Sequence, residues 1–258
     1  MTPGTAQTGR FQFSTATLCL APMAQQKAIH PQLHSVGLIK NVKVDATPSK
    51  VDLTQGPMND VVSTVVNGMP ITVSGEVYEF TAKNLAYGLS LDPAAIVDMA
   101  APVGITGAVA ANATTATAAV ATGLAIGDWG YLQDGLDDQV HVFKVTGVTG
   151  NVITFTGHPV PTGLSFSASA RIGEFNKIDA DPSKANNNFA ARIIGVSVDS
   201  NVPVVLHFPK VRIMRGFSMG FSADNFGNMP FELTPMVPLP TDPGYDGDFK
   251  TRMSAFSR

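Results

Sequence analysis

The stretch VPVVLHFPKVRIM, residues 202–214, places apolar side chains on both faces of an extended segment. A strand of this kind lies at the centre of a sheet or is covered by a neighbouring chain. The next stretch, FSMGFSADNFGNMPFEL at residues 217–233, alternates apolar and polar residues on both sides of Asp224-Asn225. Two alternating runs around a polar break predict two strands of one antiparallel sheet. Upstream, residues 192–198 alternate in the same way before a turn at Ser200-Asn201.

The first third of the chain also has strand patterns. Residues 36–45 alternate apolar and polar side chains until a proline stops the run. Residues 61–80 predict a β-hairpin, because Asn67-Gly68 between two apolar runs is a strong short-turn signal. The intervening residues 47–59 are polar and contain a Gly-Pro pair, so we interpret them as a long loop.

One segment has helical spacing instead. In FTAKNLAYGLSLDP, residues 80–93, Thr81 is a suitable N-cap, and Leu85 lies at helical spacing with Tyr87 or Leu89. A glycine and a proline limit its length. We therefore predict one short helix after Thr81.

The composition changes near residue 100 and divides the chain. Residues 103–172 begin with an almost uncharged Gly/Ala/Thr-rich run and continue with alternating strands, which predicts an inserted β-module. The main β-domain then comprises residues 35–102 and 173–238. We interpret the proline-interrupted residues 1–34 as an extended N-terminal arm. The polar, turn-rich residues 239–258 predict a C-terminal tail that is mobile or bound to a partner.

The 258-residue chain contains few charged residues, 14% against roughly 25% in a typical soluble domain. Either the core is large or much of the surface is buried against other chains. The net charge of −3 argues against tight nucleic-acid binding, which needs a basic excess. We expect the single cysteine, Cys19, to be a small buried apolar group. The N-terminal residues and the lack of a long apolar run predict no signal peptide and no membrane helix.

No motif for catalysis or cofactor binding stands out. His30 and His34 have the spacing of two zinc ligands on a helix, but Pro31 separates them and no acidic or Cys ligand is near in sequence. Three oxygen-rich clusters lack the features of a calcium loop or an acid–base pair. They are Asp179, Asp181 and Ser183; Asp242, Asp246 and Asp248; and Asp134, Asp137 and Asp138. We expect turn-forming aspartates, no metal, no cofactor and no enzymatic activity.

The order of these segments resembles a known family. Three segments define the likeness: GLIKNVKVDA at residues 37–46, FTAKNLAYGLSLD at residues 80–92, and FPKVRIMRGFSMGFSADNFGNMPFEL at residues 208–233. They resemble the major tail tube protein of long-tailed bacteriophages, over about residues 35–95 and 190–238. The inserted module and the first arm depart from the family pattern.

This resemblance implies a mainly β fold of two packed antiparallel sheets, like a sandwich or barrel, with one short flanking helix and here an inserted β-module. It implies a structural virion protein whose hexameric rings stack into a tube, and DNA passes through the β-barrel lumen without specific binding. The partners would be further copies of the chain and the tape measure, terminator and distal tail proteins. The protein would reside in the virion tail after assembly in the host cytoplasm.

The resemblance also directs attention to two groups of residues. An uncharged or acidic lumen lets DNA pass without binding it, and the polar face of residues 71–78 fits this role; an ordinary solvated sheet face is the alternative. The lumen-facing candidates are Thr72, Ser74, Glu76 and Tyr78. The loop at residues 47–59 is implied to contact the next ring. The ring-stacking candidates are Lys50, Asp52, Gln55 and Pro57. An inserted module that projects outward favours a flexible tail over a contractile one.

Two other functions fit a β-rich chain without reactive groups. One is another virion protein, such as a head-decoration, tail-terminator or baseplate component, and purification as rings or monomers instead of long tubes would indicate it. The other is a carbohydrate-binding β-sandwich. Such proteins use exposed Trp and Tyr platforms, and this chain has one Trp and four Tyr.

Overall fold

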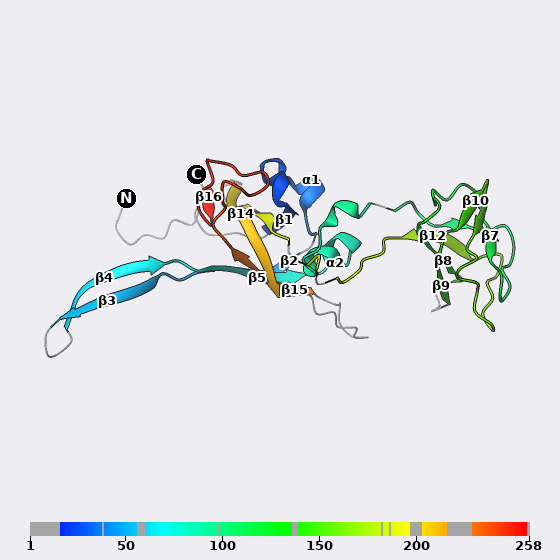
Figure 1. The fold of residues 1–258 in the computed structure, drawn as a ribbon, viewed down its shortest axis with the longest axis horizontal. Coiled ribbons are helices and arrows are strands. Elements are labelled where there is room, and N and C mark those ends of the chain that lie inside the picture. Colours follow the sequence, from blue (N-terminus) through cyan, green and yellow to red (C-terminus); the bar gives the residue numbers. More distant parts are fainter. Residues whose placement is uncertain are drawn as a thin grey trace. The chain divides into compact units, whose positions relative to one another are not determined.

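The structure is a computed structural model (Figure 1). It describes residues 16–37, 39–55, 60–97, 99–135, 139–181, 183–185, 187–196, 203–215 and 229–256. The chain divides into two compact units, residues 1–95 with 180–258, and residues 96–179; from the sequence we placed the insertion at residues 103–172. Antiparallel sheets dominate both units and helices are few, so the mainly β, sandwich-like fold is confirmed.

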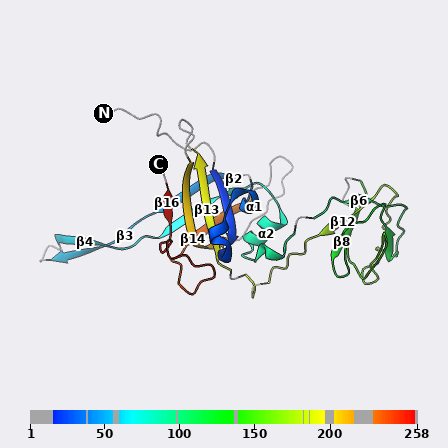
Figure 2. The same cartoon turned by 90° about the horizontal axis from the view of Figure 1, so that it is seen from above.

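One seven-stranded antiparallel sheet forms the larger unit (Figure 2). Its strands follow the order β1-β13-β14-β15-β5-β2, and β16 pairs with β14 outside this path. The strands are β1 (Ala16–Pro22), β2 (Ile39–Ala46), β5 (Ile71–Val77), β13 (Phe189–Val196), β14 (Pro203–Arg215), β15 (Met229–Pro235) and β16 (Ser254–Phe256).

The position of β14 explains why its sequence is apolar on both faces. It pairs with β13 along one edge and with β15 and β16 along the other, so it is an interior strand. Phe208 and Val211 are fully buried in the main core.

The strand predicted within residues 229–233 is confirmed by β15. The strand predicted at residues 217–222 and its turn lie outside the described residues.

The main core lies against one face of this sheet. Both β1 and β2, at the two ends of the strand order, pack against it, so the sheet curves around this core. The helix α2 (Ala82–Gly88) adds Tyr87, whose hydroxyl donates to the Leu20 carbonyl oxygen at 2.7 Å. The Oγ1 atom of Thr81 accepts a hydrogen bond from the Asn84 N–H, so the predicted helix and its N-cap are confirmed.

Strands β2 and β5 continue into β3 (Ser49–Gln55) and β4 (Asp60–Gly68) as one long β-ribbon. Ala46 pairs with Ile71 where the first pair ends, and Ser49 pairs with Gly68 where the second begins. The loop predicted at residues 47–59 is therefore wrong over residues 49–55. The turn predicted at Asn67-Gly68 is also wrong, because both residues lie in β4. We interpreted these residues as a loop because they are mostly polar, but a strand exposed on both faces can be mostly polar as well.

Both ends of the described chain pack against the sheet. The extended arm predicted for residues 1–34 is wrong from Ala16 on, because β1 pairs with β13 along its whole length. The 3-10 helix η2 (Met23–Ala28) and the short helix α1 (Pro31–His34) follow β1 and contact it. The tail predicted for residues 239–258, mobile or bound to a partner, instead packs on the chain's own sheet, because β16 pairs with β14. A second short 3-10 helix, η3 (Pro93–Ala95), follows α2.

The smaller unit, residues 96–179, has a core of its own. Its four-stranded sheet has the order β6-β12-β8-β9 and its three-stranded sheet the order β10-β11-β7. The strands are β6 (Val103–Gly104), β7 (Thr115–Thr117), β8 (Trp129–Gln133), β9 (Val140–Lys144), β10 (Gly147–Thr149), β11 (Val152–Thr154) and β12 (Arg171–Phe175). Phe143 and Phe155 are fully buried and stack with their ring centroids 4.3 Å apart.

Candidate functional site

The lumen-facing candidates lie on the face of β5 that points away from the main core. The strand alternates strictly, because Ile71, Val73, Gly75 and Val77 are buried while the residues between them are partly exposed. Those partly exposed residues are Thr72, Ser74 and Glu76. Tyr78 follows directly after the strand, and its hydroxyl donates to Glu76 Oε2 at 2.7 Å.

The neighbouring strands add charges that were not apparent from β5 alone. The cross-strand neighbours are Asp45 beside Thr72, Lys43 and Glu232 beside Ser74, and Lys40 beside Glu76. Lys40 joins this face because the register shifts between Lys40 and Lys43, where Asn41 has a positive φ of 55°. The face is therefore of mixed charge, with three acids and two lysines, instead of uncharged or acidic.

Both lysines on this face have close partners. Lys43 Nζ forms an ion pair with Asp45 Oδ2 at 2.8 Å. Lys40 Nζ lies 4.7 Å from the centroid of the Tyr78 ring, within the range of a cation–π contact. These contacts reduce the tendency of either ammonium group to attract another anion.

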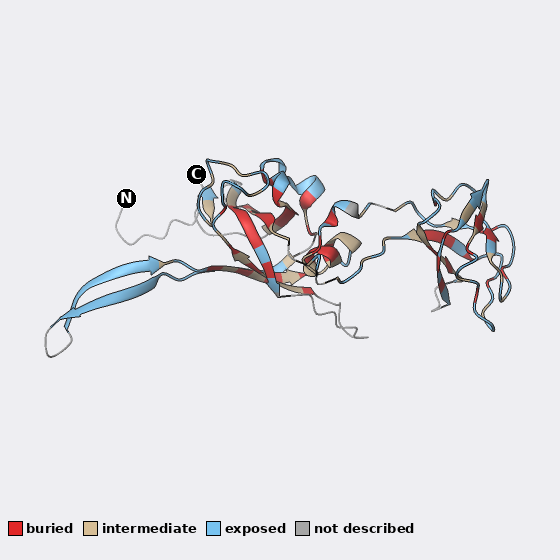
Figure 3. Ribbon diagram, in the orientation of Figure 1, coloured by how far each residue is buried: buried red, intermediate tan, exposed pale blue. Residues whose placement is uncertain are grey.

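The ring-stacking candidates Lys50, Asp52 and Gln55 lie on β3, and Pro57 lies outside the described residues. Every residue of β3 is exposed, as are all but the last residue of β4 (Figure 3). In the described part of the chain, β3 and β4 pair only with each other, so both outer edges of the ribbon are open.

One face of the β3–β4 ribbon groups three apolar side chains beside a serine. Val51 lies opposite Val65 and Leu53 opposite Ser63, which puts these three apolar side chains on one face. The other face mixes polar and apolar residues. It carries Lys50, Asp52, Thr54, Val61, Thr64 and Val66. The alternation of Val51 and Leu53 with polar neighbours was the sequence signal for this face, and we missed it by interpreting the segment as a loop.

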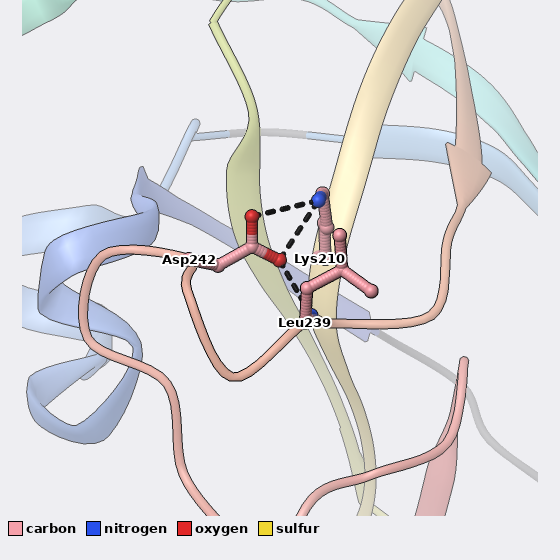
Figure 4. A network of polar contacts seen from close by, with 3 residues as sticks. All are labelled: Lys210, Leu239 and Asp242. Carbon is pink, nitrogen blue, oxygen red and sulfur yellow. Dashed lines mark hydrogen bonds and ion pairs between the residues drawn. The ribbon is translucent and has the colours of Figure 1, made fainter.

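A largely buried ion pair fastens the C-terminal segment to β14 (Figure 4). Lys210 Nζ donates to both carboxylate oxygens of Asp242, at 2.9 and 2.8 Å, and the Leu239 N–H donates to Asp242 Oδ2 at 2.7 Å. The two side chains are 10% and 13% exposed. Burial opposes ionisation of Asp242, but the hydrogen bonds from Lys210 and Leu239 outweigh it and hold the pKa of the carboxyl below its usual value.

Beside this pair, β14 buries a histidine without hydrogen bonds. His207 stacks edge-on against Phe249 with ring centroids 4.5 Å apart, and neither ring nitrogen has a hydrogen-bond partner. The pKa of His207 is lowered to about 4, mainly by burial and to a smaller extent by Arg192, while Asp246 opposes both. Along the sheet His207 lies beside Arg192, which lies beside Cys19. Burial also raises the pKa of the Cys19 thiol to about 11, so the expectation of a small buried group is confirmed.

The clusters considered as metal or acid–base sites form local structure. His34 Nδ1 accepts from the His30 N–H, and its Nε2 lies 3.1 Å from Gln25 Oε1. Asp181 accepts hydrogen bonds from Ser183, and Asp134 accepts them from Ser167; Asp137 and Asp138 lie outside the described residues. Over the described ranges, no three His, Cys, Asp or Glu residues lie close enough together to hold a metal ion.

No protein-family model matches the chain, and a comparison with curated proteins gives no match. Among the residues that the structure describes, no helix is long and apolar enough to cross a membrane. The candidate site consists of two surfaces, the polar face of β5 and the exposed β3–β4 ribbon. The first carries polar and charged side chains, and the second carries exposed apolar side chains and open strand edges.

Proposed function

We propose that the protein is a phage tail tube subunit, which forms hexameric rings that stack into a channel for DNA. Two observations support this function. Three sequence segments resemble the major tail tube proteins, and the chain builds a β-ribbon that no described part of it covers. The ribbon is the observation that carries the proposal.

The β3–β4 ribbon has the properties of an assembly element. A two-stranded hairpin alone is marginally stable in water, because it buries little apolar surface. Its open edges are also sites where another chain can pair. Val51, Leu53 and Val65 lie on one face of the ribbon and are exposed to solvent in the single chain. Contact with a neighbouring subunit would bury this face and stabilise the ribbon, and repetition of the contact in a closed ring limits aggregation.

The polar face of β5 suits the wall of a DNA channel. Lys43 and Lys40 are engaged by Asp45 and Tyr78, and acids outnumber lysines on the face. Phosphates bind proteins mainly through Lys and Arg, and each such contact adds a salt-dependent attraction. A wall whose lysines have close partners and are outnumbered by acids attracts phosphate weakly, which favours sliding of DNA.

Removal of the ribbon tests the proposal. Replacing residues 50–67 by Asn-Gly supplies a two-residue turn between the paired Ser49 and Gly68, and it leaves the paired strands β2 and β5 intact. We expect a folded, soluble subunit that forms no tubes in negative-stain electron microscopy. The matched control replaces the smaller unit, residues 96–179, by a short Gly/Ser bridge and should still form tubes. Normal tubes from the ribbon deletion would refute the proposal, and wild-type protein that forms only single rings would favour another virion protein.

A second variant tests the channel wall. Glu76→Lys adds a cation that the neighbouring residues do not balance, repeated once per subunit around the lumen. We expect intact tubes and slower DNA ejection, with the strongest slowing at low salt. Asp179→Lys, in the smaller unit, is the matched charge change and should leave the rate unchanged. A normal ejection rate for Glu76→Lys would show that this face does not line the channel.

A further inference from the structure

The four-stranded sheet of the smaller unit exposes an aromatic face. The register of β9, β8 and β12 sets nine residues in three rows on the side opposite the buried Leu132, Phe143 and Ile172. The rows are Lys144, Trp129 and Phe175; Val142, Tyr131 and Gly173; and Val140, Gln133 and Arg171. We call these nine residues the platform. The only Trp of the chain belongs to it.

The rings of the platform pack against one another and lie over a glycine. The Tyr131 and Phe175 rings stack with centroids 4.2 Å apart and an interplanar angle of 22°. A Cβ atom at Gly173 would lie 2.7 Å from the Tyr131 ring, so glycine is needed there for the ring to lie over the strand. Val140, Val142 and Phe175 remain exposed. The result is a broad apolar surface that faces solvent.

The charges of the unit are distributed unevenly. Residues 96–179 contain three Lys or Arg and seven Asp or Glu. All three cations lie at the platform, because Lys144 and Arg171 occupy row positions and Lys177 Nζ lies 5.6 Å from the Trp129 ring centroid. None of the nine row positions is acidic. Lys177 is paired with Asp179, which leaves Lys144 and Arg171 without an acidic neighbour in the rows.

We propose that the platform binds an acidic saccharide in which uronate rings alternate with neutral rings. The apolar C–H face of a sugar ring packs against Trp129 and Phe175. The Gln133 amide offers a donor and an acceptor for hydroxyl groups. Lys144 and Arg171 pair with carboxylates, and the Arg171 guanidinium can do so through two parallel hydrogen bonds.

The spacing of the cations favours such a saccharide over a single-stranded nucleic acid. Lys144 and Arg171 lie two strands and two rows apart, which places their backbones about 17 Å from each other. Two distant cations match a chain that is charged only at alternate rings. A single-stranded nucleic acid has a charge at every nucleotide and needs a basic groove along its backbone.

Trp129, the single tryptophan, makes the test specific to the platform. The full-length protein is titrated with a hyaluronan hexasaccharide, in which uronate and neutral rings alternate, and Trp fluorescence and calorimetry are recorded. We expect saturable binding. The double variant Lys144→Glu/Arg171→Glu and the single variant Phe175→Ala should each weaken it at least tenfold. Lys184→Glu, an exposed lysine of the larger unit, is the matched control and should bind as the wild type does.

Three outcomes would overturn the inference. They are no saturable binding at millimolar hexasaccharide, equal affinity for a neutral chitin hexasaccharide, and tighter binding of a dT oligonucleotide than of the acidic saccharide. Phe175 is exposed, so its truncation preserves the fold, and circular dichroism of each variant checks this. The inference is independent of tube formation, because no platform residue belongs to the β3–β4 ribbon.

Discussion

The two halves of the long ribbon have the same pairing and opposite surroundings. In the half made by β2 and β5, one face of β5 is buried in the main core, and β15 pairs with its second edge. In the half made by β3 and β4, every residue but the last is exposed. The backbone hydrogen bonds alone therefore do not distinguish a strand that packs in the core from one that is exposed on both faces. Burial of side chains makes that distinction.

The energetic difference between the halves follows from burial. A backbone hydrogen bond contributes only about 1 kcal/mol net, because the unfolded chain bonds to water instead. A fully buried Val or Leu side chain contributes about 1.5–3 kcal/mol. The β2–β5 half gains this from Val73 and Val77, whereas Val51 and Val65 gain little until something covers them. The four predictions that follow test how burial determines the contribution of a side chain to stability, the largest effect first.

Truncation of matched leucines should give the largest contrast. Leu233 lies opposite Val73 and is fully buried, so Leu233→Ala should lower the free energy of unfolding by about 3–4 kcal/mol. Leu53 on β3 is 55% exposed, and Leu53→Ala should change it by no more than about 0.5 kcal/mol. Urea unfolding of both variants measures the difference. Equal losses would mean that the ribbon already packs in the single chain.

The sequence predicted the packed half better than the exposed half. The side chains of β5 alternate because one face of the strand is buried, and β14 is apolar on both faces because it is an interior strand. Both strands formed as expected. The β3 strand was missed because we interpreted its mostly polar residues as a loop, although Val51 and Leu53 alternate with polar neighbours. The Asn67-Gly68 signal failed because the pairing partners of β4 and β5 lie earlier in the chain, in β3 and β2.

The candidate surfaces were predicted only in part. The polar face of β5 follows from alternation within one strand, but Lys40 and Lys43 reach it through pairing with β2 and a register shift. The aromatic platform combines residues that are far apart in the sequence, such as Trp129 and Phe175. A single strand pattern contains no information about which strand lies beside it, so these features required the fold.

Acid should destabilise the packed sheet through His207. The unfolded chain takes up a proton at this residue near pH 6.5, whereas the folded protein does so only near pH 4. Stability is therefore lost as the pH falls from 6.5 to 4 and levels off below, by about 3 kcal/mol. His207→Leu should not lose this stability as the pH falls. Burial also lowers the pKa of His34, but His34 is present in both proteins, so its effect cancels when the variant is compared with the wild type. Urea unfolding at pH 7.5 and 4.5 measures it, and identical pH profiles would contradict the assignment.

Loss of the ion pair at the C-terminal segment should have a somewhat smaller effect. Lys210→Met leaves the Asp242 carboxylate largely buried without its partner, which should cost about 2 kcal/mol at pH 7. The pKa of Asp242 is lower in the folded protein than in the unfolded chain, where it is about 4. The ion pair therefore stabilises the fold fully above about pH 4, and this stabilisation disappears as the pH falls through the pKa of the folded protein. Lys27→Met removes a longer pair with Asp246, at 3.6 Å, whose lysine is 65% exposed, and it should cost at most about 0.5 kcal/mol. Equal effects of the two variants at pH 7, measured by thermal unfolding, would contradict the role of burial.

The smallest effect is expected on the ribbon itself. Thr64 Oγ1 donates to Asp52 Oδ1 at 2.6 Å, but both residues are exposed, so Thr64→Val should change global stability by less than about 0.5 kcal/mol. Amide hydrogen exchange gives the sharper measurement, since it reports local opening. Amides of β3 and β4 should exchange with an opening free energy near zero in the isolated subunit, while those of β5 and β14 should approach the global value. Assembly should protect the ribbon amides, because a partner would then cover them. If the ribbon amides of the isolated subunit are protected as strongly as those of β5, the two halves do not differ in stability. The exposed ribbon would then give no support to contact with a neighbouring subunit.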